Sequence, residues 1–132
     1  MSKYRRIAGL TPIALAVVIL AVQANSQYLE WKWFDQYSKV TSWEEKLHLD
    51  NFAIYLLKDP SLLGYMAFRV GENEKASVVR KRAERNKQYL VRKRGVPSDR
   101  IRLIYLGKAD KTTFILQPLT RDKPFPGVGN TP

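Results

Sequence analysis

Apolar side chains after position 48 recur with the spacing of an α-helix. They stand at i, i+3, i+4, i+7 and i+8, which places them on one helix face. Ser42 followed by Glu45 matches a capping box, in which a hydroxyl and a carboxylate each accept a hydrogen bond from a free backbone amide. Pro60 should end this helix at Asp59, because proline disfavours helical backbone in the residue before it. The apolar face consists of Leu49, Phe52, Ala53, Leu56 and Leu57.

A second amphipathic helix is predicted after a turn at residues 71–73. Asn73 is a candidate N-cap, because its side chain can accept from a free amide of the first turn. Gly95 is the expected stop, and Pro97 prevents the helix from continuing. Most positions outside the apolar stripe are Lys or Arg. The stripe, which includes one polar residue, consists of Ala76, Val79, Ala83, Asn86 and Leu90.

The remaining segments have strand patterns. Residues 33–40 form a short strand-like lead, and residues 63–70 are apolar on both faces, which is typical of a central strand. Residues 100–106 alternate in character, and residues 111–116 form a last strand with Pro118 marking its end. The order β-α-β-α-β-β predicts an α+β fold, a two-layer sandwich in which two helices cover one face of a sheet.

The first 24 residues have the order of a secretory signal peptide. Three cations, Lys3, Arg5 and Arg6, precede an apolar run over residues 7–22, and Ala24 is a candidate cleavage position. The alternative is a retained membrane anchor, although the run is short for a spanning helix. Either outcome carries residues 25–132 across the membrane, which predicts a periplasmic or envelope location with residues 25–32 as a linker or strand lead.

The chain is strongly basic. Its 132 residues hold 23 Lys and Arg against 12 Asp and Glu, a net charge of +11. Residues 1–24 contribute three cations and no acid, so 20 basic and 12 acidic residues leave +8 on the remainder. Such a surface attracts polyanions: nucleic acid, acidic lipid headgroups or anionic wall polymers. Residues 119–132 are rich in proline and glycine and should be a disordered tail.

Nothing in the sequence indicates catalysis or a cofactor. There is no cysteine, which excludes disulfides and thiolate metal sites. His48 is the sole histidine, and one imidazole without a second soft ligand does not make an ordinary metal site. Nucleotide-binding glycine loops and paired-histidine motifs are also missing. We therefore expect no enzyme, no metal and no cofactor.

The stretch from Val78 to Ile101 carries a family resemblance. It contains Arg82 and Ala83, then Tyr89 six residues past the alanine, a glycine stop, and a strand that begins at once. This order resembles the second helix and following strand of the OmpA-like domain, a periplasmic module that in many bacteria grips peptidoglycan. The element order extends the resemblance to residues 33–118, and it implies the same two-layer fold for them.

The resemblance also implies a ligand pocket that is only half present. Family members use an Asp after the second strand and an Arg in the second helix to hold diaminopimelate, an opposite-charge clamp. Arg82 matches that arginine, whereas the aspartate has no counterpart. Glu72 could substitute for it, and Asn73 lies beside it, so the candidate ligand residues are Arg82, Glu72 and Asn73. The alternative for Arg82 is one more cation on a solvated basic face.

These observations predict a non-catalytic envelope protein. Its role would be structural or binding, with weak or absent attachment to peptidoglycan or to another anionic envelope component. The alternative is an accessory subunit, tethered to the inner membrane by residues 7–24, whose domain contacts a membrane-protein partner. Nucleic acid is disfavoured as a partner, because only Tyr89 interleaves with the basic helix and an export segment precedes the domain.

Overall fold

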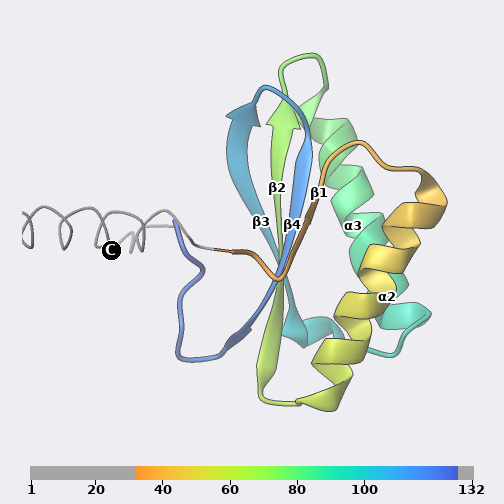
Figure 1. The fold of residues 1–132 in the computed structure, drawn as a ribbon, viewed down its shortest axis with the longest axis vertical. Coiled ribbons are helices and arrows are strands. Elements are labelled where there is room, and N and C mark those ends of the chain that lie inside the picture. The colour runs from red at the N-terminus through yellow and green to blue at the C-terminus, as the bar shows by residue number, and fades with distance from the viewer. Residues whose placement is uncertain (1–31, 128–132) are drawn as a thin grey trace, which may run out of the picture. The chain divides into compact units, whose positions relative to one another are not determined.

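The computed structural model describes residues 32–127, which form an α+β fold with a four-stranded mixed sheet and two helices. Both helices lie on the same face of the sheet (Figure 1). The expected order of strands and helices is confirmed. In chain order the elements are β1 (Asp35–Tyr37), α2 (Ser42–Lys58), β2 (Leu62–Gly71), α3 (Ala76–Arg92), a 3₁₀ turn (Ser98–Arg100), β3 (Ile101–Ala109) and β4 (Thr113–Thr120).

The sheet has the strand order β1-β4-β2-β3, so β2 is central as predicted. β2 runs parallel to β3, because α3 crosses over between them, and antiparallel to β4. Met66 of β2 pairs with Leu103 on one side and Leu116 on the other. β2 is apolar on both faces because both are covered: Met66 and Phe68 lie in the core under the helices, and Ala67 packs with Phe125 on the opposite face.

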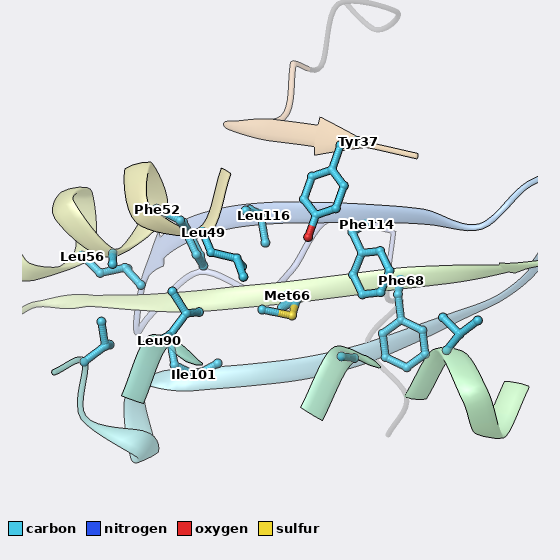
Figure 2. Close-up of a cluster of buried hydrophobic side chains, with 14 of the residues drawn as sticks. Tyr37, Leu49, Phe52, Leu56, Met66, Phe68, Leu90, Ile101, Phe114 and Leu116 are labelled. Carbon is cyan, nitrogen blue, oxygen red and sulfur yellow. The ribbon is translucent and has the colours of Figure 1, made fainter. Parts of the chain in front are cut away.

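The main core fills the space between the helices and the sheet (Figure 2). Phe52 and Leu56 of α2 and Leu90 of α3 are fully buried there. α2 approaches β2 closely at Gly64, where an added Cβ would come within 2.6 Å of Cδ1 of Leu56. A larger residue at this position would push the helix away from the strand.

The end of α2 is held by a buried arginine. Nη2 of Arg100 donates to the carbonyl of Leu56 at 2.7 Å and to that of Asp59 at 2.8 Å, while Nε donates to the carbonyl of Leu62 at 3.0 Å. Helix C-terminal carbonyls need such donors, and a cation there also suits the helix dipole. One side chain at the start of β3 therefore fixes the α2–β2 turn.

Two helix caps differ from the sequence prediction. The capping box of α2 is Thr41 with Glu44, one residue earlier than the predicted Ser42 with Glu45. Glu44 N donates to Oγ1 of Thr41 at 3.2 Å, and Thr41 N donates to Glu44 at 2.7 Å. The predicted box was wrong because Glu45 points to the buried side of the helix instead.

The predicted ends of α3 are half correct. Asn73 is not its N-cap: the cap is Lys75, which makes no side-chain capping bond. The prediction for Gly95 is confirmed, since it adopts a left-handed φ of +77° that favours glycine. Its amide donates to the carbonyl of Val91 at 3.2 Å, which helps to satisfy the last turn.

The last strand is longer than predicted. β4 passes through Pro118 to Thr120, and β1 pairs only with residues 114–116, so β4 has no strand neighbour on that side at Pro118. Proline is tolerated in a strand where no ladder partner needs its missing amide. The expected end at 118 was therefore wrong.

Part of the segment expected to be a disordered tail packs on the sheet. Phe125 is 4% exposed and lies with Ala67, Ile115 and Leu119 on the face opposite the helices. Its ring stacks on Trp33 with centroids 5.2 Å apart. An aromatic side chain supplies enough apolar area to hold a proline-rich segment in place. Residues 128–132 lie outside the described part of the chain.

The predicted signal peptide or anchor, residues 1–24, also lies outside the described residues, as does most of the predicted lead at residues 25–32. Within residues 32–127, neither helix has the length and apolar character needed to cross a bilayer.

The core predicts a stability difference between neighbouring leucines. Leu56→Ala or Leu90→Ala should each cost roughly 2–5 kcal/mol in the free energy of unfolding, because each removes a fully buried side chain. Leu57, predicted to be buried, is 46% exposed, so Leu57→Ala should cost less than about 1 kcal/mol. Urea unfolding of the three variants measures this. Equal losses at positions 56 and 57 would contradict the helix orientation.

Candidate functional site

Arg82, the arginine that the resemblance singles out, forms an ion pair with Glu45. Nη2 lies 2.7 Å from Oε2 of the glutamate, and Nε lies 3.1 Å from both carboxylate oxygens. The side chains are 27% and 11% exposed. Partial burial alone would lower the pKa of Arg82, but the hydrogen bonds and charge of Glu45 outweigh it and raise that pKa. The guanidinium is therefore held by a carboxylate from within the same domain.

Aromatic rings lie beneath the pair. The guanidinium carbon of Arg82 is 4.8 Å from the centroid of the Phe114 ring, a cation–π geometry. Phe114 stacks in turn on Tyr37 at 5.6 Å. Burial raises the pKa of Tyr37, and the charge of Glu45 raises it further, so this hydroxyl stays protonated. No hydrogen bond of standard geometry reaches the buried hydroxyl within the described residues.

Arg82 lines two hollows. The first has a volume of about 430 Å³ and opens among the β1–α2 connection, the β2–α3 turn and the β3–β4 turn. It holds both signs of charge, which suits a zwitterionic or anionic ligand held without covalent chemistry. Its lining residues are Ser38, Lys39, Val40, Gly71, Asn73, Glu74, Arg82, Asp110, Lys111 and Thr112.

The structure brings two of the three predicted ligand residues together. Asn73 and Arg82 line the same hollow, whereas Glu72 is not among its lining residues. Glu74 lines it instead, and its charge contributes to the raised pKa of Arg82. The turn between β2 and α3 is short. The carboxylate that lines the hollow with Arg82 is therefore Glu74, two residues after the predicted Glu72.

The second hollow, of about 370 Å³, lies between α2 and α3. Asn86, predicted to fall in the apolar stripe of α3, is 7% exposed, and its amide nitrogen is buried without a hydrogen-bond partner in the described structure. The lining residues are Val40, Ser42, Glu45, Lys46, Leu49, Arg82, Arg85, Asn86 and Tyr89.

Glu45 is the residue that sequence reasoning missed. It was assigned to a helix cap, yet it stands four residues before Leu49 and seven before Phe52, on the buried face of α2. A carboxylate on a buried helix face needs a cation or several donors. That position could have predicted a basic partner on the neighbouring helix.

Two further polar contacts tie α2 to its neighbours. Asp50 accepts from the Tyr89 hydroxyl at 2.6 Å and from Nε and Nη2 of Arg94 at 2.6 and 2.9 Å. On the other side of the helix, Nδ1 of His48 lies 2.6 Å from Oδ2 of Asp35 in β1. His48 thus has a structural partner, and no group of three metal-ligating side chains exists among residues 32–127.

Comparison with known proteins assigns this chain to no family. No family model matches the chain, and no curated protein is significantly similar to it in sequence.

The ion pair predicts a specific loss of stability. Glu45→Ala should lower the free energy of unfolding by roughly 2–3 kcal/mol, because it leaves a half-buried guanidinium without a counter-charge. Glu84→Ala, which removes an exposed glutamate from α3, should change it by less than about 0.5 kcal/mol. Chemical denaturation measures both, and matching effects would show that the pair contributes little.

The lowered pKa of Asp50 predicts how the stability of a second variant, Asp50→Asn, depends on pH. Burial acts to raise the pKa of Asp50, but hydrogen bonds from Arg94 and Tyr89 prevail and lower it below its usual value of 3.8. A lowered folded-state pKa adds stability that is fully present above the unfolded-state value and is lost as pH falls through the folded-state value.

Asp50→Asn should therefore cost roughly 0.5–1 kcal/mol at neutral pH, a modest figure because the site is partly exposed. The difference from the parent chain should stay constant above about pH 5 and shrink below about pH 4. Urea unfolding at several pH values tests this. A difference that persists unchanged at pH 3 would contradict the charged role of Asp50.

Proposed function

We propose that this chain is a non-catalytic module of the bacterial cell envelope, similar to OmpA-like domains, whose attachment to peptidoglycan is weak or absent. The observation that carries the proposal is the pairing of Arg82 with Glu45. The resemblance assigns this arginine to the carboxylate of a wall peptide, whereas here the arginine pairs with a carboxylate of α2.

The geometry of the guanidinium explains the expected weakness. Arg82 presents its Nε and Nη2 edge to Glu45, which is one of the two edges of a guanidinium that can hold a carboxylate in a bidentate way. A ligand would then meet only the other edge, Nη1 and the second N–H of Nη2, without the Nε–H bond and with the positive charge already neutralised by Glu45. Losing one charge-assisted bond costs about 1.5–3 kcal/mol, or roughly 10- to 150-fold in affinity.

The rest of the hollow supports residual binding through charge. Lys39 and Lys111 line it beside the acidic Glu74 and Asp110, so a ligand with both charges would find partners for each. The net charge of +8 beyond residue 24 adds a general attraction to anionic wall material. Attraction of this kind is screened by salt, because it acts between solvent-exposed groups.

Co-sedimentation of the full chain with purified peptidoglycan sacculi tests the proposal. Binding should be weak and strongly salt-dependent, and Arg82→Ala should reduce it no more than Arg92→Ala does, because both remove one positive charge. Glu45→Gln should raise affinity about 3- to 10-fold by releasing Arg82, whereas Glu84→Gln, an equal charge change at an exposed site, should have a smaller effect.

Tight, salt-resistant binding that only Arg82→Ala abolishes would contradict the proposal. It would mean that Arg82 leaves Glu45 when the wall ligand arrives, and that the domain is a dedicated wall anchor.

A further inference from the structure

Helix α2 has a second apolar face that the core does not use. Four large apolar side chains lie along it, all well exposed: Trp43 at 67%, Leu47 at 43%, Ile54 at 53% and Leu57 at 46%. They stand at i, i+4, i+11 and i+14, which keeps them within one narrow arc of the helix. We refer to these four residues as the exposed stripe.

The exposed stripe points away from the sheet. The buried face of α2 carries Leu49, Phe52 and Leu56, which contact the sheet and are shielded from water. At about 100° per residue, Trp43, Leu47 and Ile54 lie on roughly the opposite side of the helix. Exposed apolar side chains gathered in one stripe indicate a contact surface more often than scattered ones do.

Helix α3 presents a row of cations beside this stripe. Lys81, Arg85 and Arg92 repeat the spacing i, i+4, i+11, and all three are exposed. Their row lies opposite the buried side chains of Val79 and Leu90, so it also faces away from the sheet. None of the three forms an ion pair within the described residues. We refer to them as the basic row.

The two helices are neighbours, which joins the stripe and the row into one surface. The Arg82–Glu45 bridge connects α3 to α2 directly, and both helices cover the same face of the sheet (Figure 1). Lys46 lies between them, on the wall of the hollow that separates the helices. The outer surface of the helix layer is thus apolar along α2 and positively charged along α3.

We propose that this surface binds an anionic lipid bilayer. The exposed stripe would enter the boundary between headgroups and acyl chains, while the basic row contacts lipid phosphates. Tryptophan suits that boundary, where its ring is partly apolar and partly wet. The inference goes beyond the proposed wall module and does not depend on it.

Charge and composition favour a lipid surface over other partners. Protein interfaces are depleted in lysine, whereas this surface carries Lys46 and Lys81 beside two arginines. A nucleic acid would engage the cations but would leave the aliphatic Leu47 and Ile54 unused. In the alternative in which residues 7–22 stay as a membrane anchor, two weak membrane contacts in one chain would reinforce each other.

A single fluorescent label tests the proposal, because the chain has no cysteine of its own. Ile54→Cys in the full chain, labelled with an environment-sensitive fluorophore, should brighten and shift to shorter wavelength with vesicles of phosphatidylcholine and phosphatidylglycerol. Vesicles of phosphatidylcholine alone should give little response, and about 0.5 M salt should reverse the signal. The same label at Lys108→Cys, an exposed site on β3, should not respond.

Charge variants provide a matched control. Replacing Lys81, Arg85 and Arg92 with glutamine should reduce partitioning of the label at position 54 about 100-fold, since each cation near an anionic surface contributes about 5-fold. Replacing three exposed cations elsewhere with glutamine removes the same charge and should reduce it far less. These are Arg102, Arg121 and Lys123.

Three outcomes would overturn the proposal. The label at position 54 could remain in water in every vesicle, including vesicles that the chain binds through another segment. It could respond equally to neutral and anionic vesicles, which would leave the basic row without a role. It could respond without lipid as the protein concentration rises, which would assign the exposed stripe to a second copy of this chain.

Discussion

The bidentate bridge between Arg82 and Glu45 sets the arrangement of the helix layer. Taking two charges out of water is costly, and the attraction between them offsets that cost only with good geometry and hydrogen bonds to both groups. Here the pair has three hydrogen bonds and a ring of Phe114 beneath the guanidinium. Since the pair joins α2 to α3 above β4, neither helix can rotate or slide without breaking it. The exposed surfaces of both helices are therefore fixed relative to each other.

Under the proposed function, the same bridge competes with ligand binding at Arg82. A guanidinium without a partner in the protein can direct all of its hydrogen bonds to a ligand carboxylate. Arg82 must first separate from Glu45. Release would leave two charges only partly hydrated, because the side chains are 27% and 11% exposed. A module built in this way keeps the arginine at the position where the resemblance expects it and uses it to hold the fold.

The sequence predicts the order of elements well because that order depends on local signals. The helical spacing around Phe52, the apolar run of β2 and the glycine stop at Gly95 each act over a few residues. Two of the errors arise where a segment distant in the sequence determines the structure. Pro118 continues a strand because β1 is short, and Phe125 is held by residues more than fifty positions away in β2. The site depends entirely on a contact between segments that are distant in the sequence, since Glu45 and Arg82 are 37 positions apart.

The helical spacing predicted that Leu57 is buried, whereas the structure exposes it. This error has a physical cause that bears on function. Leu57 stands eight residues after Leu49, so spacing alone puts it with the core, but it also stands fourteen after Trp43 and ten after Leu47. An α-helix with two apolar faces offers two overlapping sets of positions, and a residue near the border fits both. Burial in the structure divides them: Leu56 is fully buried and Leu57 is 46% exposed. A surface helix of a stable domain needs only the first face to pack. The second adds nothing to folding and raises the risk of aggregation, so its presence beside a row of unpaired cations points to a contact outside the domain.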